Sequence, residues 1–297
     1  MMDVLEVSGL LTVQDLGRPG YGHWGVSPSG AADRTSLRLA NRLVGNDEGA
    51  AALELTLGTL TVRARSRTLV AITGAPAAGW IDDRPVPTLR SLLLDAGRTL
   101  RLERPTVGLR TYLAAAGGVA VPEVLGSRST DTLSGLGPAP VQVGDVLPLG
   151  PPAAGPPPAV DVFTQRYLGG GDGPLPVLLG PRADWFSTDV LRTLSSASYR
   201  VTSDSNRVGV RLDGAALTRS RTDELAPEGV VRGAMQVPPS GMPMVFLSDH
   251  PVTGGYPVLA VLLPAAADRL AQLRPGDEVR FALVGPGRTA EDSPESR

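Results

Sequence analysis

The first stretch of sequence that could do chemistry leads from an apolar segment into a helical pattern near the start of the chain. Gln14, Asp15 and Arg18 carry planar groups of the kind that fix a carboxylate or an amide through paired hydrogen bonds. Ser29 and Asp33 stand just before the helical pattern, where free backbone N–H groups and the helix dipole favour an anion. We therefore predict catalytic roles for Gln14, Asp15, Arg18 and Asp33, and anion binding at Ser29. The alternative is a capped helix with Asp15 and Arg18 paired to hold a turn.

A second candidate segment combines paired glycines with a hydroxyl-rich loop. Gly117 and Gly118 end a small-residue strand, and paired glycines let a ligand or another strand approach the backbone closely. Ser127, Arg128 and Thr130 follow, and their side chains could hold a carboxylate or a phosphate. We predict that Gly117, Gly118, Ser127 and Arg128 contact the substrate. The alternative is a turn whose Arg satisfies backbone carbonyls.

The third candidate lies in the second half, where Arg207 and Arg211 are four residues apart within Ser205–Leu212. The apolar alternation there predicts a strand, so both guanidinium groups should project from one face and suit an anionic ligand. Replacing either Arg with Ala should then weaken ligand binding and barely change stability. A solvated strand face is the alternative. The same half supplies four further predicted substrate contacts: Gln236, Gly254, Gly255 and Tyr256.

The composition excludes several kinds of chemistry. The chain has no Cys, only two His, and no Lys, since all 28 basic residues are Arg. Thiolate catalysis and zinc ribbons are thereby excluded, and we predict no metal site. A chain without Lys cannot itself carry biotin, form a Schiff base or build a Walker A loop. With a net charge of −2, no long apolar stretch and no signal-peptide pattern, we expect a cytoplasmic protein without nucleic-acid or membrane partners.

The elements that must position these residues are predicted to be mostly short strands. The 36 Gly and 28 Pro punctuate the chain in the way that suits strands joined by tight turns. Three segments show helical spacing, namely Asp33–Val44, Trp185–Ser195 and Pro264–Leu273. Strand patterns appear at Leu5–Val13, Leu60–Arg65, Thr68–Ile72, Arg98–Glu103, Leu109–Ala116, Val177–Leu179, Tyr199–Thr202, Met244–Leu247 and Pro257–Leu262.

The sequence divides into two halves of similar character. A Pro- and Gly-rich stretch at 150–174 predicts a semi-rigid linker and loop between a first half, 1–149, and a second half, 175–285. Both halves end on a Gly-Asp turn followed by a strand pattern, at Val143–Leu147 and at Pro275–Phe281, which hints at two related barrels. The polar residues 286–297 predict a disordered tail.

Several separated motifs, in order, resemble one known family. The segments TVQDLGRPGYGHWGVSPSGAAD (12–33), ANRLVGN (40–46), ALELT (52–56), YLAAAGGVAVPEVLGSRST (112–130), SNRVGVRL (205–212), GAMQVPPSGMP (233–243) and TGGYPVLA (253–260) carry the resemblance. They are similar to the allophanate-hydrolase-subunit-2 family, whose members include biotin-dependent carboxyltransferase domains. The resemblance covers nearly the whole chain outside the predicted linker and tail.

This resemblance implies a mainly β fold of two cyclophilin-like β-barrel halves with a few short helices. It also implies a subunit of an ATP-dependent 5-oxoprolinase, an amidohydrolase that opens the lactam 5-oxoproline to glutamate. Such a subunit would be inactive alone and would act with a directly bound B-type partner and with an A-type partner. ATP with Mg²⁺ would then serve the assembled complex, and biotin would not be attached to this chain.

Two other functions fit the same resemblance. One is a regulatory protein that binds a kinase-inhibitor-like partner and does no chemistry. The other is the carboxyltransferase module of a biotin-dependent system that acts on a urea-like amide, with biotin arriving on another protein. ATP-driven lactam opening requires positioning and charge stabilisation more than a covalent nucleophile, and Arg, Gln, Asp and backbone N–H groups suit that task.

Overall fold

The computed structural model describes residues 1–152 and 173–285. These residues form two compact units, 1–21 with 28–152 and 22–27 with 173–285. Residues 22–27 therefore group with the second unit, although the sequence placed all of 1–149 in the first half. Within that unit the Ser27 hydroxyl donates to the Ser248 carbonyl at 3.5 Å, the outer limit of a hydrogen bond. Most of the predicted linker, 150–174, and all of the predicted tail, 286–297, lie outside the described residues.

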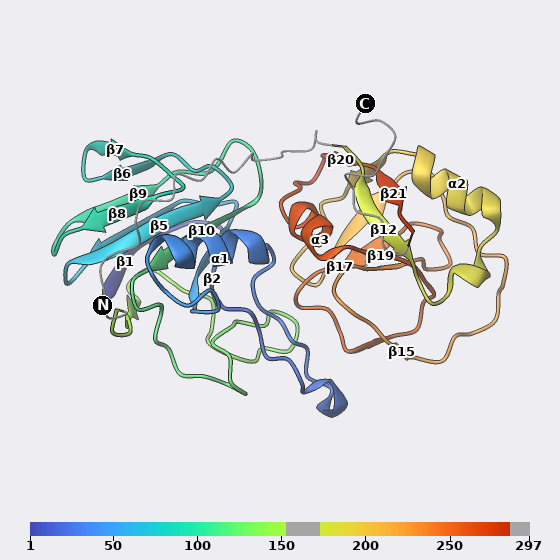
Figure 1. Cartoon of the computed structure of the whole chain (residues 1–297), viewed down its shortest axis with the longest axis horizontal. Coiled ribbons are helices and arrows are strands. Elements are labelled where there is room, and N and C mark those ends of the chain that lie inside the picture. The colour runs from blue at the N-terminus through green and yellow to red at the C-terminus, as the bar shows by residue number, and fades with distance from the viewer. Residues whose placement is uncertain (153–172, 286–297) are drawn as a thin grey trace. The chain divides into compact units, whose positions relative to one another are not determined.

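The first unit consists of two antiparallel sheets (Figure 1). The six-stranded sheet has the order β11 (Val146–Leu147), β1 (Met2–Val7), β4 (Leu60–Ala64), β9 (Thr99–Leu102), β6 (Gly79–Ile81) and β7 (Arg84–Val86). The five-stranded sheet has the order β2 (Leu10–Gln14), β3 (Ala52–Thr56), β10 (Arg110–Ala115), β5 (Thr68–Gly74) and β8 (Ser91–Leu94).

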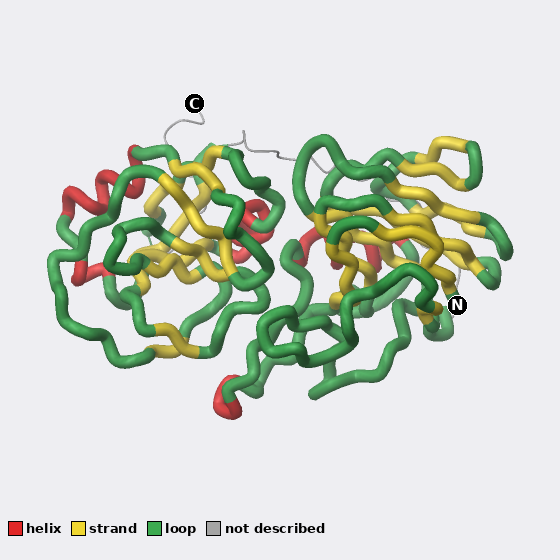
Figure 2. Tube along the Cα trace, turned by 180° about the vertical axis from the view of Figure 1, so that it is seen from behind, coloured by secondary structure: helices red, strands yellow, loops and turns green. Residues whose placement is uncertain are grey.

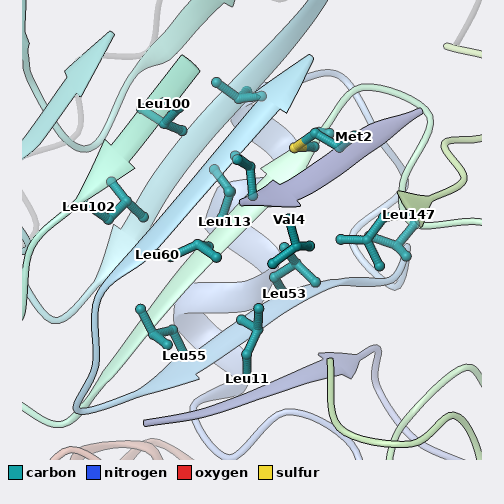
Figure 3. Close-up of a cluster of buried hydrophobic side chains, with 14 of the residues drawn as sticks. Met2, Val4, Leu11, Leu53, Leu55, Leu60, Leu100, Leu102, Leu113 and Leu147 are labelled. Carbon is teal, nitrogen blue, oxygen red and sulfur yellow. The ribbon is translucent and has the colours of Figure 1, made fainter. Parts of the chain in front are cut away.

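The core of this unit lies between the two sheets. Alternate residues of each strand point inward, so Leu53 and Leu55 of β3 meet Val4 of β1 and Leu60 of β4 (Figure 3). The predicted single strand Leu5–Val13 is two strands, because the chain turns at Ser8 and Gly9 and passes from one sheet to the other. Gly9 has φ +75° there, and a Cβ would lie 2.5 Å from the Thr56 carbonyl oxygen.

The opposite face of the five-stranded sheet is covered by α1 (Arg34–Leu43), which packs on β5 and β10. Asp33 caps its first turn by accepting from the Ser36 N–H at 2.9 Å, and Gly45 follows its end with φ +76°. The predicted helix at Asp33–Val44 is thus confirmed with both of its boundary residues. Figure 2 shows that the long segment between β10 and β11, residues 116–145, is drawn entirely as loop.

The second unit is built on one eight-stranded sheet. Its order is β20 (Glu278–Val279), β13 (Tyr199–Val201), β14 (Gly209–Asp213), β17 (Met244–Phe246), β16 (Ala234–Gln236), β19 (Val258–Leu262), β12 (Leu175–Leu179) and β21 (Phe281–Leu283). The two end strands, β20 and β21, are separated only by Arg280, so the sheet curls into a nearly closed barrel. The other elements are β15 (Glu228–Gly229), β18 (Thr253–Gly254), α2 (Thr188–Ser196), α3 (Pro264–Leu270) and two 3₁₀ turns, Gly22–Trp24 and Ala183–Trp185.

The predicted fold class, mainly β with a few short helices, is confirmed. The helix predicted at Trp185–Ser195 begins later, because the Ser187 hydroxyl caps α2 by accepting from the Val190 N–H. The helix predicted at Pro264–Leu273 ends three residues early, at Leu270.

Tyr199 of β13 is a buried phenol in the barrel, and its ring lies 5.9 Å from that of Phe281. Among the described residues its hydroxyl has no hydrogen-bond partner, and burial raises its pKa to about 12. We predict that Tyr199→Phe stabilises the protein at pH 7 by about 1 kcal/mol, since a buried unpaired hydroxyl costs free energy. Urea denaturation measures the change.

The same substitution should also change how the free energy of unfolding depends on pH above pH 10. The folded-state pKa of Tyr199 lies above its unfolded value of 10.0, so its contribution is fully present below pH 10 and disappears as the pH rises through about 12. Wild type should therefore lose more stability over that interval than Tyr199→Phe, by roughly 3 kcal/mol at most. Tyr256→Phe, at an exposed position, serves as the control. Parallel wild-type and Tyr199→Phe curves would contradict the prediction.

Candidate functional site

The carboxylate of Asp15, just after β2, gathers donors from the loop at 127–129. It accepts from the Ser127 hydroxyl at 2.7 Å, the Arg128 N–H at 2.6 Å and the Ser129 hydroxyl at 2.5 Å. The Gly17 N–H adds a fourth bond at 2.7 Å. A carboxylate that accepts this many hydrogen bonds fixes the groups around it. We call these residues the Asp15 cluster.

Gln14 and Arg18, on either side of Asp15, bind the same loop. Gln14 Nε2 donates to the Thr130 carbonyl at 2.9 Å, and the Ser29 hydroxyl donates to the same oxygen at 3.3 Å. Arg18 Nη2 donates to the Ser129 carbonyl. The alternative in which Asp15 and Arg18 pair with each other is therefore wrong, because each side chain bonds to the loop instead.

Three buried polar atoms in this region have no hydrogen-bond partner among the described residues: Gln14 Oε1, Arg18 Nη1 and Thr130 Oγ1. We call these three atoms the unpaired triad. Each such atom costs about 1–3 kcal/mol when left unsatisfied, so three together indicate a place for ordered water or for a polar group of a ligand. The triad offers one acceptor, one cationic donor and one hydroxyl.

The backbone beside the triad is held closely and carries a strained residue. The Arg18 N–H donates to the Pro28 carbonyl at 2.7 Å, and the Ala31 N–H donates to the Asp15 carbonyl at 2.9 Å, so the two ends of the 18–28 loop lie side by side. Gly17 permits this approach, because a Cβ there would lie 2.4 Å from the Pro28 oxygen. Ser29 has φ +52°, a conformation that non-glycine residues adopt mainly where surrounding structure enforces it.

The N–H groups expected to be free before α1 are already hydrogen-bonded. The Ala32 N–H donates to Glu54 Oε2 at 2.9 Å and the Asp33 N–H donates to the Tyr112 hydroxyl at 2.8 Å. Asp33 itself receives the Ser36 N–H, so it caps the helix. The prediction of free N–H groups for an anion before α1 is therefore wrong, because Glu54, Asp33 and the Tyr112 hydroxyl already accept hydrogen bonds from the N–H groups there.

Behind that helix start lies a network that the sequence analysis missed. Glu54 is fully buried, accepts from the Tyr112 hydroxyl at 2.7 Å and lies 3.4 Å from Arg110 Nε. Burial, and then the charges of Glu54 and Asp33, raise the pKa of Tyr112 well above its usual value. Tyr112 stands opposite Glu54 on β3 and Thr73 on β5. A single Glu inside the apolar strand ALELT was the signal that could have indicated it.

The paired glycines admit another part of the chain. A Cβ on Gly117 would lie 2.1 Å from the Gly150 carbonyl oxygen, and the Gly150 N–H donates to the Gly118 carbonyl at 3.0 Å. The sequence predicted that either a ligand or another segment approaches these glycines. In the structure another segment does so, and it occupies the space beside Gly117 that a ligand would need.

Arg128 is engaged locally. Its Nε donates to the Val121 carbonyl at 2.8 Å and its Nη1 lies 2.8 Å from Glu123. This matches the alternative in which the Arg satisfies backbone carbonyls, while the Arg128 N–H and not its side chain belongs to the Asp15 cluster.

The predicted pair of Arg side chains on one strand face is wrong. β14 begins only at Gly209, because Asn206 Oδ1 accepts from the Val208 N–H at 2.8 Å and forms a turn there. Arg207 is buried and makes a two-pronged ion pair with Asp249, at 2.9 and 3.0 Å. Arg211 projects from β14 into solvent. The two guanidinium groups therefore have different surroundings and different tasks.

The remaining predicted residues of the second unit lie together. Gln236 is buried and donates to the Tyr256 carbonyl at 3.0 Å. A Cβ on Gly254 would lie 2.3 Å from Gln236 Nε2, so that glycine makes room for the amide. Gly255 and the exposed Tyr256 complete the turn. Within the described residues, no group of His, Asp and Glu side chains could hold a metal ion, and no helix is long and apolar enough to cross a membrane.

The described residues thus form two β-rich units that bury several Arg, Gln and Asp side chains. The model of the carboxyltransferase domain, subdomains A and B, matches residues 24–283. The chain belongs to this carboxyltransferase-domain family.

Relatives within the family differ in size. The chain is 39% identical to the C subunit of 5-oxoprolinase from Escherichia coli K12, over 95% of this chain and 90% of that protein. The crystal structure of TTHA0988 is 37% identical with a TM-score of 0.85, and the match covers 95% of this chain and 55% of that one. The Kluyveromyces lactis urea amidolyase structure is 31% identical with a TM-score of 0.87, over 96% of this chain and 19% of that one. This chain thus spans about half of the former structure and about a fifth of the latter.

The different surroundings of the two Arg residues predict different effects of Ala substitution. Arg207→Ala should destabilise the protein by about 3–5 kcal/mol, because it leaves the Asp249 carboxylate buried without its partner. Arg211→Ala should change stability by no more than about 0.5 kcal/mol, as is usual at exposed positions. Urea denaturation of both variants measures the difference, and similar midpoints for the two variants would refute it.

Proposed function

We propose that this chain is the C-type subunit of an ATP-dependent 5-oxoprolinase that acts with B-type and A-type partners. The observation that carries the proposal is the extent of the match to the E. coli protein: 95% of this chain aligns with 90% of a protein named as the C subunit of that enzyme. The urea amidolyase relatives are much longer, and the chain aligns with only 17% of the one from Lachancea kluyveri. A match to nearly the whole of a protein that is itself named as one subunit therefore favours the subunit function.

The chemistry of lactam opening suits the groups that this chain offers. A lactam is a stable amide, and ATP can activate it by transferring a phosphoryl group to the amide oxygen. Such a reaction requires the substrate to be positioned and its charges to be balanced. Because the chain has no Lys, it has no Walker A lysine, and we place the ATP and Mg²⁺ site on a partner protein.

We assign substrate recognition in this chain to the unpaired triad. Arg18 Nη1 and Thr130 Oγ1 can donate to the substrate carboxylate, while Gln14 Oε1 can accept from the lactam N–H. The three atoms are closed off from solvent, so the loop at 124–137 has to move before a ligand reaches them. Gly137 sits tightly in that loop, since a Cβ there would lie 2.0 Å from the Ser129 oxygen and 3.1 Å from Arg18 Nη2.

A second candidate function is that of a carboxyltransferase acting on a urea-like amide. The TM-score of 0.87 with the K. lactis urea amidolyase structure favours it. Biotin would then have to be attached to another protein, because this chain has no Lys. The same triad could bind the planar urea amide.

Reconstitution distinguishes these functions. The chain co-expressed with its B-type and A-type partners should elute as one complex and hydrolyse ATP in response to 5-oxoproline, releasing glutamate. The chain alone should do neither. ATP hydrolysis that responds to urea and requires a biotinylated protein would instead support the carboxyltransferase function. If the chain does not form a complex with the B-type partner, the proposal is overturned.

Thr130→Val tests the triad without disturbing the fold. The substitution removes only an atom that has no partner, so stability should be equal or slightly higher. If the hydroxyl binds the substrate, KM for 5-oxoproline should rise about tenfold, as the loss of one hydrogen bond to a charged group predicts. Thr202→Val is the matched control, because Thr202 Oγ1 is also unpaired but lies in the second unit. An unchanged KM in Thr130→Val would remove the triad from substrate recognition.

A further inference from the structure

The outer edge of the five-stranded sheet, formed by β8, is unprotected. Ser91–Leu94 has the sequence Ser-Leu-Leu-Leu, with no charge and no Pro. Within the described residues its backbone hydrogen-bonds to β5 alone, with Leu93 opposite Leu69. An edge strand of this kind presents unpaired N–H and C=O groups that accept a further strand.

The other edges of the three larger sheets are covered by hydrogen bonds, contain Pro or are very short. The free side of β2 receives the Thr130 and Val141 N–H groups at 2.9 and 2.8 Å. β7 is three residues long and contains the exposed Pro85, while β11 has only two residues. The end strands of the second unit's sheet, β20 and β21, have only two and three residues. Native proteins usually manage sheet edges in these ways, so the bare β8 edge stands out.

The side chains around the edge are apolar. Leu93 is 43% exposed, and Leu69, Leu89 and Leu92 are only partly buried against the two cores of the unit. A group of leucines beside an unpaired strand is typical of an interaction surface.

The ends of β8 indicate which strand would pair with it. Arg90 precedes the strand and Asp95 follows it, both exposed, and Asp95 makes an exposed ion pair with Arg67 at 3.3 Å. A strand that is basic at one end and acidic at the other attracts an antiparallel copy of itself and repels a parallel one. Antiparallel pairing centred on Leu93 places the two exposed Leu93 side chains opposite each other on the same face. It also places Ser91 opposite the Asp95 of the other copy.

We propose that two copies of this chain associate through β8, in an antiparallel, two-fold symmetric pairing that joins their five-stranded sheets. A two-fold axis perpendicular to the sheet keeps the α1-covered faces of both copies on the same side, so the pairing closes as a dimer and does not propagate. The surface is distinct from the unpaired triad and does not depend on the proposed enzymatic function.

The test is the mass of the isolated full-length chain in solution, measured by sedimentation at micromolar concentration. Wild type should have the mass of two chains. Leu93→Lys should raise the dissociation constant at least about tenfold, because it puts a charge in the centre of the pairing. Leu133→Lys, at another exposed Leu of the same unit, is the matched control and should remain dimeric.

Charge exchange tests the direction of pairing, because only an antiparallel pair brings the Arg90 end of one copy beside the Asp95 end of the other. Arg90→Asp and Asp95→Arg should each weaken the dimer, and the double variant should restore it. A monomeric wild type, or a dimer that Leu93→Lys leaves intact, overturns the proposal. So does a monomeric wild type whose binding to the B-type partner is weakened by Leu93→Lys, since the occupant of the edge would then be that partner. Circular dichroism of each variant checks that it folds.

Discussion

The carboxylate of Asp15 is the point on which the geometry of the candidate site depends. Two loops that are more than a hundred residues apart in sequence meet there, and neither has a helix or strand at the contact to order it. A carboxylate that accepts four hydrogen bonds provides the missing order, because each bond fixes one donor of Gly17, Ser127, Arg128 or Ser129. Asp15 therefore orients the loop that carries Thr130.

Glu54 also holds a loop in place, deeper in the same unit, where burying its charge costs more free energy. A fully buried carboxylate loses its hydration, and the Arg110 guanidinium, the Tyr112 hydroxyl and the Ala32 N–H together compensate that loss. The result is that the backbone at Ala32 and Asp33 is held by side chains from the sheet below it. The strained Ser29 lies only three residues earlier, and a conformation of that kind persists where the surrounding structure is rigid. The two buried carboxylates thus hold the 14–33 segment from both ends.

Much of the fold could be predicted from local sequence, because residues that are close together in the sequence determine short strands and helix caps. The alternation in Leu60–Arg65 and the Asp33 cap each correspond to an observed element. The outcome at Arg207 could not be predicted in this way. Its partner Asp249 is forty-two residues away, and the Asn206 turn interrupts an alternation that looked like a continuous strand. Gly117 illustrates the same limit, since the segment that fills its space arrives from Gly150.

The candidate site was predicted in its residues and not in its arrangement. Gln14, Asp15, Arg18, Ser29 and Ser127 do come together, but mostly to bind one another's backbone, and what is left over for a ligand is three atoms. Because most polar groups of this unit hold loops in place, the proposed function gives this chain the task of positioning a substrate and gives the reactive chemistry to partner proteins. The absence of Lys and Cys from the sequence agrees with this division of labour, and so does the separate existence of relatives that are named as one subunit of an enzyme.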